Sequence, residues 1–467
     1  HRFLRAALCR QVPMLSLPGG VWQFGWGRNA RVFKSSLSDA TSSIGTAWAK
    51  NKMQTNQLLR MAGLPVPEQI MVRDLEMALR EAARIGFPVV LKPADLDQGH
   101  GVEAGLSNKA ELEAAFKRVA ARRRGILLEK HIDGQDVRIN VVNGQFQDAI
   151  ARYPAGVTGD GVLSVADLIA ATNRDPRRSE RRFADMRPLT LNDEAHELLK
   201  AQGLTTRSVP QPQQFVRLRR AANVSSGGRT EGVSHELHPD NARLSEQVAK
   251  LLRLDIAGID LLIPDHTRSW REVGGAICEV NAQPQVGLTY PQIYDHLFDT
   301  FLTGQGRIPI ALILSDDPKM APELDTIAGS DRLVGLRVLP SARADAQDQQ
   351  SPKLATQVRS ALIDPTCTGV VILSDGQDVL QSGLPVDRID MLWVSGWTGS
   401  VADFRKRISR IIPHLHPGDI LVDEQANAAC HALQLPPGFR LQPTGCSAAL
   451  QMLMDRLKSG LEGGASC

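Results

Sequence analysis

The chain has 467 residues, which is enough for roughly two to four domains of ordinary size. Hydrophobic residues make up 42% of the sequence and charged residues 22%, which is typical of a globular protein with more than one core. The net charge of +3 is too small for this length to indicate a nucleic-acid or membrane partner, and the aromatic content of 4% argues against base-stacking surfaces. No apolar run approaches the roughly 18–20 residues that span a bilayer.

The cysteines indicate the redox compartment that we expect for the protein, and the first residues indicate how the given sequence begins. The six cysteines are scattered without the spacing of a metal site, so we expect a reducing cytoplasm and no disulfides. The opening HRFLRAALCRQVP is too short and too interrupted for a signal peptide, and it lacks a methionine. We therefore expect upstream sequence to be missing, and residues 1–45 to be the remnant of an N-terminal domain or a linker.

The next part of the chain has the pattern of a nucleotide-binding unit. A helical pattern over 47–60 ends at AGLPVPE, where Gly63 and two prolines stop it. A second helix, Leu75–Ile85, leads into the apolar run 89–91 and a glycine-rich loop, an order that predicts an α/β or α+β fold. Further elements are expected as strands at 126–129, 137–142, 258–263 and Ala276–Asn281, and as loops at 173–187 and 223–230.

A break falls near residues 303–306. Beyond it, RIPIALIL, GVVILSD and DMLWVSG are apolar runs of strand length separated by helical stretches. A small domain with a parallel sheet accounts for this order. The fold class is thus expected to be multidomain, with α/β and α+β parts.

Asp260, Glu279 and Asn281 form the strongest candidate site. Glu279 and Asn281 stand two apart in a strand-like run, so their side chains share one face, and the stretch 264–275 can turn the chain back beside Asp260. Three oxygen ligands on adjacent strands suit one or two Mg²⁺ ions, which also bind phosphate oxygens. A solvated hairpin face is the alternative, but an acidic residue inside the apolar run CEVNA needs a partner, which favours the metal.

A phosphate site is indicated near Lys92. This lysine follows the run FPVVL, and the loop DQGHGV with Gly99 and Gly101 comes soon after. A backbone that can approach phosphates beside a cation at a strand end is a phosphate-binding arrangement. Lys52 offers a second cation, although for each lysine taken singly a surface charge is the preferred interpretation.

The segment LLEKHIDGQDVRINVV is a predicted hairpin with charged ends. Glu129 and Lys130 close its first strand, and Asp136 and Arg138 share one face of its second. Such a connection can bind an adenine edge and a ribose, but on the residues alone a plain charged hairpin is the preferred interpretation.

The order of these segments resembles that of the ATP-grasp superfamily. More closely, the stretch from about residue 41 to residue 298 resembles the ATP-grasp domain of cyanophycin synthetases. The matching segments are TSSIG, LPVPE, GDGVLSVADLI, NRDPRR, SSGG, ELHPDN, LDIAGIDLLIPD and GGAICEVNA.

The resemblance implies a role for each matched residue. The residues for ATP would be Lys52 and Lys92 at the phosphates with the loop of Gly99 and Gly101, Glu129 and Lys130 at the adenine, and Asp136 at the ribose. Asp260, Glu279 and Asn281 would hold Mg²⁺, and Arg219 would act with Lys92 on the acyl-phosphate. The loop around the growing peptide's end would comprise Asn223, Ser225, Ser226, Gly227 and Gly228.

Two segments depart from the family pattern. The family tends to show LRDNANLSTGG and EVNA-x-PG, whereas this chain has LRRAANVSSGG and EVNAQPQVG. Both segments match the region where acyl donor and acceptor meet, so they leave the identity of the substrate open.

The C-terminal third lacks the phosphate loop that the resemblance would place there. In cyanophycin synthetases the segment that corresponds to RIPIALIL is followed by the P-loop of a Mur-ligase domain. No Gly-x-x-Gly-Lys-Thr occurs in this sequence. We therefore expect an ATP-grasp domain over 46–304 and a degenerate Mur-ligase-like domain over 305–467. This arrangement resembles the shorter cyanophycin synthetases, which keep only the ATP-grasp site.

The function that follows is an ATP-dependent carboxylate–amine ligase that polymerises β-aspartyl-arginine dipeptides into cyanophycin. The expected cofactors are ATP and Mg²⁺, and the expected partners are the dipeptide, the growing polymer and further copies of the chain, without nucleic acid or membrane. Two alternatives stay open: a ligase for another amino acid or peptide, and a non-catalytic partner of an active synthetase.

Two further clusters are weaker candidates. His235 and His238 in SHELHPDN lack a third metal ligand, so a helix N-terminus at Pro239 is the preferred interpretation. An arginine cluster is either a solvated loop or a contact for a carboxylate-rich chain; it comprises Arg174, Arg177, Arg178, Arg181 and Arg182.

Overall fold

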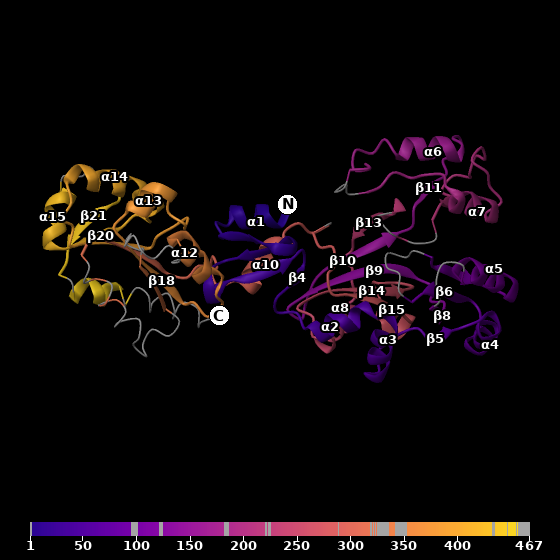
Figure 1. Ribbon diagram of the computed structural model, residues 1–467. Helices are drawn as coiled ribbons and strands as arrows, with labels where there is room; N and C mark the ends of the chain where they lie inside the picture. The colour runs from indigo at the N-terminus through magenta and orange to yellow at the C-terminus, as the bar shows by residue number, and fades with distance from the viewer. Residues whose placement is uncertain are drawn as a thin grey trace. The chain divides into compact units, whose positions relative to one another are not determined.

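The computed structural model describes most of the chain. The described residues are 2–94, 101–120, 125–181, 186–219, 222, 226–287, 289–317, 320, 322, 324, 336–340, 353–431, 435–445, 447–453 and 455. They form two compact units, residues 35–293 and residues 1–34 with 294–467 (Figure 1). Among the described residues, no helix combines the length and apolarity needed to span a membrane.

The unit of residues 35–293 contains a four-stranded antiparallel sheet. The strand order is β5-β8-β6-β7, with α4 and α5 packed on an apolar core that includes Leu91 and Leu128. The bounds are β5 Gln69–Val72, α4 Leu75–Ile85, β6 Val89–Pro93, β7 Glu103–Leu106, α5 Lys109–Ala120 and β8 Ile126–Lys130.

A five-stranded antiparallel sheet forms the centre of the same unit. Its order is β13-β10-β9-β14-β15, and alternate residues of β9 (Val137, Ile139 and Val141) share an apolar core with α8 on one face. The opposite face therefore carries Asp136 and Arg138. The bounds are β9 Gln135–Val142, β10 Gln145–Tyr153, β13 Arg229–Gly232, α8 Pro239–Leu251, β14 Ile256–Ile263 and β15 Ala276–Asn281.

Smaller elements complete this unit. A subdomain with its own core is built from β11 and β12 with α6 and α7, which lie together in Figure 1. Helices α2 and α3 contact the edge strand β15. The bounds are β4 Leu37–Ser38, α2 Ser43–Lys50, α3 Lys52–Met61, β11 Gly156–Thr158, α6 Val165–Thr172, α7 Asp193–Ala201, β12 Phe215–Arg217 and α9 Trp270–Val273.

The second unit joins the start of the chain to its C-terminal part through aromatic packing. The ring of Phe3 stacks on Phe298 with centroids 4.9 Å apart, and Phe24 meets Phe298 edge-on at 5.2 Å. The elements in this region are α1 Arg2–Cys9, β1 Met14–Leu17, η1 Pro18–Gly20, β2 Val21–Phe24, η2 Gly27–Asn29, β3 Arg31–Lys34 and α10 Ile293–Phe301.

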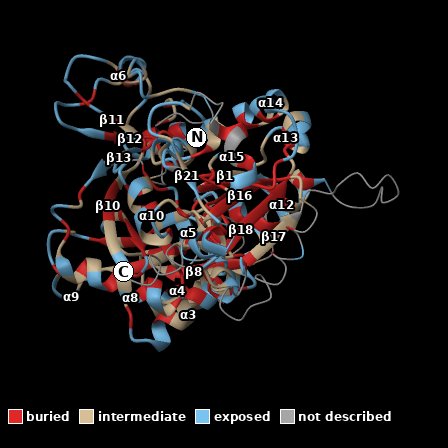
Figure 2. Ribbon diagram, turned by 90° about the vertical axis from the view of Figure 1, so that its left-hand side faces the viewer, coloured by how far each residue is buried: buried red, intermediate tan, exposed pale blue. Residues whose placement is uncertain are grey.

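The C-terminal part is a six-stranded parallel sheet of order β17-β18-β16-β19-β20-β21. Its central strands are buried on both faces, as the red ribbons of β16 and β18 in Figure 2 show. The prediction of a parallel α/β domain is thus confirmed. The bounds are β16 Ile310–Ser315, β17 Leu336–Pro340, α12 Leu354–Ile363, β18 Gly369–Ser374, α13 Gln377–Ser382, β19 Met391–Ser395, α14 Val401–Ile411, η4 Ile412–His414, β20 Asp419–Val422, α15 Glu424–His431 and β21 Arg440–Pro443.

One expectation differs from the structure. The helix predicted over 47–60 is two helices, α2 and α3, because Asn51 between them has an extended backbone and its side chain accepts a hydrogen bond from the Gln54 N–H as the N-cap of α3. Residues 1–34 belong to the unit that contains 294–467, and the interpretation of residues 1–45 as the remnant of an N-terminal domain or a linker stays a prediction. The Mur-ligase-like origin of residues 305–467 stays a prediction.

A buried polar pair lies between β9 and β10. Asp148 and Asn140 face each other, and Asn140 Nδ2 donates to both carboxylate oxygens of Asp148, at 3.1 and 3.2 Å. The Oδ1 atom of Asn140 is buried without a hydrogen-bond partner among the described residues. Burial raises the pKa of Asp148 to about 6, although the hydrogen bond from Asn140 acts in the opposite direction.

We predict that Asp148→Asn stabilises the protein at neutral pH. The folded state holds a proton on this carboxyl up to about pH 6, whereas the unfolded chain loses it near 3.8, so the free energy of unfolding falls by about 3 kcal/mol between these values and stays low above them. Asparagine does not ionise, and its amide can donate to the unpaired Oδ1 of Asn140. The variant should gain about 1–2 kcal/mol at pH 7, measured by urea denaturation.

Asp160→Asn is the control of opposite sign. Hydrogen bonds from the backbone N–H groups of Leu163 and Val162 lower the pKa of Asp160. Replacing this carboxylate should therefore lower the free energy of unfolding at pH 7, and should change it less at pH 3, where the carboxylate is largely protonated in the unfolded chain. An Asp148→Asn variant whose unfolding free energy falls between pH 4 and pH 6 as steeply as that of the wild type would contradict the assignment.

Candidate functional site

The polar face of the five-stranded sheet gathers charged residues from four strands. In the antiparallel register Asp260 lies opposite Glu279 on one side and opposite Arg138 on the other, and Asp136 lies opposite Arg152. Neighbouring residues in such a register have Cβ atoms about 5 Å apart. The predicted pairing of the strands that carry Asp260 and Glu279 is confirmed.

Asp260 is held by two arginines. Arg138 donates through Nε to Oδ1 and through Nη2 to Oδ2, the second contact at 3.0 Å, and Arg152 Nη2 lies 2.8 Å from Oδ2. The side chain of Asp260 is only 3% exposed. Burial acts to raise the pKa of Asp260, but Arg138 and Arg152 outweigh it and lower the pKa below its usual value.

Asp136 shares Arg152 with Asp260. Arg152 donates to Oδ1 of Asp136 through Nη2 at 2.7 Å and through Nε at 3.1 Å. Burial raises the pKa of Asp136, and the negative charge of Asp260 adds to this effect while Arg152 opposes it. The four side chains of Asp136, Arg152, Asp260 and Arg138 therefore form one continuous ion-paired chain across the sheet.

Glu279 and Asn281 lie at the edge of this network. Lys52, the first residue of α3, places its Nζ atom 3.5 Å from Oε1 of Glu279. Asn281 lies opposite Gly258, and its Nδ2 atom is buried without a hydrogen-bond partner among the described residues. An amide N–H donor that lacks an acceptor beside two carboxylates fits a site whose remaining partner is an acceptor group of a ligand, such as a phosphate oxygen.

These side chains suit Mg²⁺ by their chemistry. Two carboxylates and an amide on adjacent strands are hard oxygen donors, and Mg²⁺ keeps one or two protein carboxylates while phosphates and waters complete its octahedron. Among the described residues, no three His, Cys, Asp or Glu side chains are close enough together to hold a metal ion without such help. The residues that would hold it are Asp260, Glu279 and Asn281.

A second ion pair lies in the four-stranded sheet. Lys92 on β6 contacts the carboxylate of Glu129 on the neighbouring strand β8, and both side chains are less than a tenth exposed. Gln69 on β5 donates to the same carboxylate oxygen. The ammonium group of Lys130 donates to the carbonyls of Gly86 and Phe87, at 3.0 and 3.2 Å.

A pocket brings three of these candidate residues together. Lys52, Glu129 and Glu279 all line it, although they come from α3, β8 and β15. The thiol of Cys278 also lines the pocket, and burial raises its pKa well above the usual value, so it is not a nucleophile at neutral pH. The pocket joins the predicted nucleotide residues to the predicted metal residues.

Arg219 lies in the subdomain of β11 and β12. Its guanidinium donates to Oγ1 and the carbonyl of Thr190, at 2.7 and 2.9 Å, and to the carbonyl of Leu218 at 2.7 Å. Glu194 lies 3.8 Å away. Burial lowers the pKa of Arg219, with Glu194 acting in the opposite direction.

The predicted peptide loop is partly described. Arg178 donates to the carbonyl of Gly227 and to that of Arg187, both at 2.8 Å. Gly227 has φ +93°, and a Cβ there would lie 3.0 Å from Leu189. Arg178 thus links this loop to the segment before Leu189, whereas Arg177 pairs with Asp175 at 2.6 Å. Of the other predicted residues, Ser226, Gly228 and Gly101 are described, while Gly99, Arg182, Asn223 and Ser225 lie outside the described residues.

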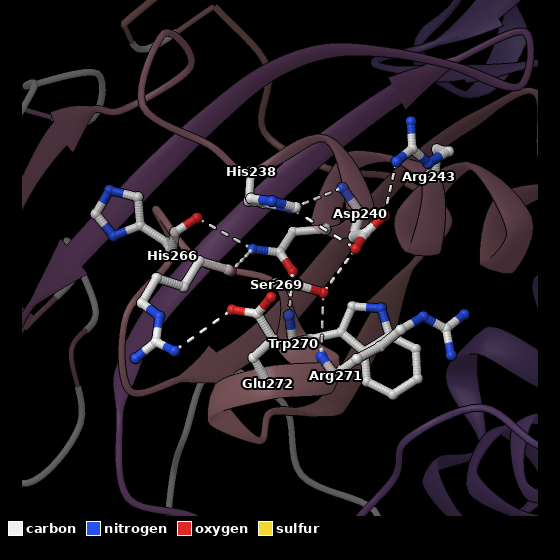
Figure 3. Close-up of polar contacts among 10 residues, drawn as sticks. His238, Asp240, Arg243, His266, Ser269, Trp270, Arg271 and Glu272 are labelled. Carbon is white, nitrogen blue, oxygen red and sulfur yellow. Dashed lines mark hydrogen bonds and ion pairs between the residues drawn. The ribbon is translucent and has the colours of Figure 1, made fainter.

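The histidine motif caps a helix, as the sequence predicted (Figure 3). His238 is the N-cap of α8, and its Nδ1 atom accepts from the N–H of Asp240 at 3.1 Å. Ser269 donates to Asp240 at 2.7 Å, which ties the turn before α9 to the start of α8. These contacts brace the hairpin that carries Asp260 and Glu279.

Sequence reasoning missed the role of the two arginines. Arg138 was placed on the face of Asp136 but not in the site, and Arg152 was not considered. The signal was the same one that singled out Glu279: a charged residue inside an apolar strand, here QDVRINVV and QDAIARY, needs a buried partner.

Comparisons with known proteins find an ATP-grasp domain in a part of the chain that contains Lys52, Lys92 and Glu129 of this site. Residues 46–149 match the model of the ATP-grasp domain family. The cyanophycin synthetase of Nostoc sp. is 34% identical over 279 residues, which cover 59% of this chain and 31% of that protein. The cyanophycin synthetase of Crocosphaera subtropica is 29% identical over 411 residues, which cover 82% of this chain and 46% of that protein.

A second kind of relative is also similar. The glutathione biosynthesis bifunctional protein GshAB of Mannheimia succiniciproducens is 31% identical over 238 residues, 50% of this chain and 31% of that protein. The chain spans about a third of the length of the Nostoc relative. Residues 46–149 thus match the ATP-grasp domain, and the chain is similar to cyanophycin synthetases, as its motifs predicted.

Proposed function

We propose that the protein is an ATP-dependent carboxylate–amine ligase that forms amide bonds. The observation that carries the proposal is the pocket lined by Lys52, Glu129 and Glu279, which joins two sheets of a chain that matches the ATP-grasp domain. In the reaction, a substrate carboxylate oxygen attacks the γ-phosphorus of ATP to give an acyl-phosphate and ADP. An amine then attacks the acyl carbon, and phosphate leaves with the bridging oxygen.

Each candidate residue has a defined task in this reaction. Lys52 and Lys92 bind the phosphates, and the ion pair of Lys92 with Glu129 fixes the lysine beside the nucleotide. Asp260, Glu279 and Asn281 would hold Mg²⁺, which when bound neutralises charge on the phosphate oxygens. Arg219 lies on a separate subdomain, and its role at the acyl-phosphate rests on the resemblance alone.

The proposed substrate is the dipeptide β-aspartyl-arginine, added to a growing cyanophycin chain. Joining such dipeptides needs one activation per step, at the backbone carboxylate of the chain, and this matches a protein with one nucleotide site. The cyanophycin synthetases of Nostoc and Crocosphaera support this choice. A ligase for another peptide is the second candidate, because the segments LRRAAN and QPQVG depart from the family pattern and GshAB is also similar.

The C-terminal unit supports a single nucleotide site. At the carboxyl edge of its parallel sheet, Asp316 accepts hydrogen bonds from the N–H and hydroxyl of Thr398, at 3.1 and 2.7 Å. Asp423 accepts from the N–H of Gly396 at 2.7 Å and from Ser395 Oγ at 2.8 Å. Ligands of open parallel sheets bind at this edge, and here the protein's own carboxylates take donors that a phosphate would use.

We predict that Glu279→Gln lowers ADP formation by about 100-fold or more, because a neutral amide cannot balance the charge of Mg²⁺. The melting temperature should change little, since Glu279 is part-exposed and Lys52 can turn to solvent. Glu272→Gln is the matched control, because Glu272 is exposed on α9 and pairs only weakly with Arg268 at 3.4 Å. Equal activity of the two variants at low Mg²⁺ would remove Glu279 from the metal site.

We expect one nucleotide to bind per chain. Calorimetric titration with a non-hydrolysable ATP analogue and Mg²⁺ should give a stoichiometry of about one, and Lys92→Met should weaken this single event at least tenfold. A second binding event that survives in Lys92→Met would show that the C-terminal unit binds nucleotide.

The substrate is tested by comparing purified β-aspartyl-arginine with free aspartate plus arginine, each with ATP and Mg²⁺. Polymer and ADP should form from the dipeptide and not from the free amino acids, because one activation cannot build both the backbone and the side-chain bonds. Turnover with another amine and none with the dipeptide would contradict the dipeptide assignment but not the ligase. No ADP with any carboxylate and amine would favour a non-catalytic partner.

A further inference from the structure

We propose that Arg138 and Arg152 form a latch on Asp260 that keeps free divalent cations out, so that the metal binds only together with a nucleotide. This inference rests on the proposed function, since it takes Asp260 and Glu279 as the metal carboxylates. It concerns the state before ATP binds and assigns a task to two arginines that the reaction itself does not use.

The contacts of Asp260 leave little room for a cation. Arg138 engages both carboxylate oxygens, and Arg152 adds a third contact to Oδ2 at 2.8 Å. Two donors on Oδ2 use both of its lone pairs, so only Oδ1 keeps an acceptor site. A metal ion must therefore compete with two guanidinium groups for a buried carboxylate.

A glycine on β14 leaves room for the side chain of Arg138. Gly258 lies two residues before Asp260 on the same face of β14, and a Cβ there would lie 2.7 Å from Cβ of Pro284 and 3.1 Å from Cδ and from Nη1 of Arg138. Glycine at this position thus leaves room for Pro284 and for the side chain of Arg138 on its way to Asp260.

The charges of the site cancel before ligands bind. Three carboxylates face three cationic groups, which are Asp136, Asp260 and Glu279 against Arg138, Arg152 and Lys52. A neutral site offers no net attraction to a dication, and a dication near two guanidinium groups is repelled by both. The phosphates of a nucleotide supply the missing negative charge and oxygen ligands, and they give Lys52 another partner in place of Glu279.

The test measures Mn²⁺ binding by the loss of the free-ion electron paramagnetic resonance signal, with and without a non-hydrolysable ATP analogue. Wild-type protein should bind Mn²⁺ with the analogue and at least tenfold more weakly without it. Arg138→Met and Arg152→Met should each bind Mn²⁺ without the analogue at least tenfold more tightly than wild type does. Each single variant leaves Asp260 one guanidinium partner, which limits the loss of stability.

Two controls separate charge from folding. Arg138→Lys keeps the positive charge but cannot contact both carboxylate oxygens, so its analogue-free Mn²⁺ binding should lie between that of wild type and that of Arg138→Met. Arg407→Met removes an arginine of similar burial, 15% exposed against 13% for Arg138, from the other unit and should leave Mn²⁺ binding unchanged. A gain of binding cannot be produced by a misfolded protein that has merely lost its site.

Three results would overturn the latch. Wild-type protein that binds Mn²⁺ equally well with and without the analogue would show that no latch exists. Folded Arg138→Met and Arg152→Met variants that gain no analogue-free binding would show that the arginines do not exclude the metal, while the proposed function stands. Wild-type protein that binds no Mn²⁺ even with the analogue would contradict the proposed metal site itself, and the latch with it.

Discussion

The ion pairs of Asp260 with Arg138 and Arg152 are the interaction on which the site depends. A buried carboxylate costs several kcal/mol unless charged partners compensate it, and here two arginines on neighbouring strands do so. Asp260 lies opposite Arg138 on β9 and opposite Glu279 on β15, and because side chains alternate along a strand, all three side chains lie on one face of the sheet. A slip of one residue would turn these charges into the apolar core that α8 covers.

The part of the site that could be predicted lies within single strands. Glu279 and Asn281 share a face by the period of two, and the turn before β15 returns the chain to Asp260, so local pattern was sufficient. Arg152 was missed because one of its partners, Asp260, lies two strands away, and its pairing with Asp136 depends on the register of β9 and β10, which the local pattern does not fix. The sequence did not predict the break between α2 and α3 at Asn51, because the helical pattern continues across it. Only the capping contact from Asn51 to Gln54 divides the two helices.

At the level of the two units, too, local sequence pattern predicts single elements but not the contacts between distant segments. The apolar runs of the C-terminal third were sufficient to predict a parallel sheet, since strands buried on both faces are apolar throughout. The packing of Phe3 and Phe24 on Phe298 joins residues nearly 300 positions apart, which sequence pattern cannot reveal. At the carboxyl edge of this sheet, Asp316 and Asp423 accept hydrogen bonds from the backbone N–H groups of Thr398 and Gly396, so the strand ends are satisfied by the protein's own side chains.

Transfer of labelled oxygen tests the central claim most directly. If a carboxylate is activated as an acyl-phosphate, one of its oxygens leaves with the phosphate when the amine attacks. β-Aspartyl-arginine labelled with ¹⁸O in the aspartyl α-carboxylate should therefore yield phosphate that carries one ¹⁸O atom per amide bond formed, detected by mass spectrometry. Amide formation accompanied by unlabelled phosphate would contradict the account, because the carboxylate would then have been joined without passing through an acyl-phosphate.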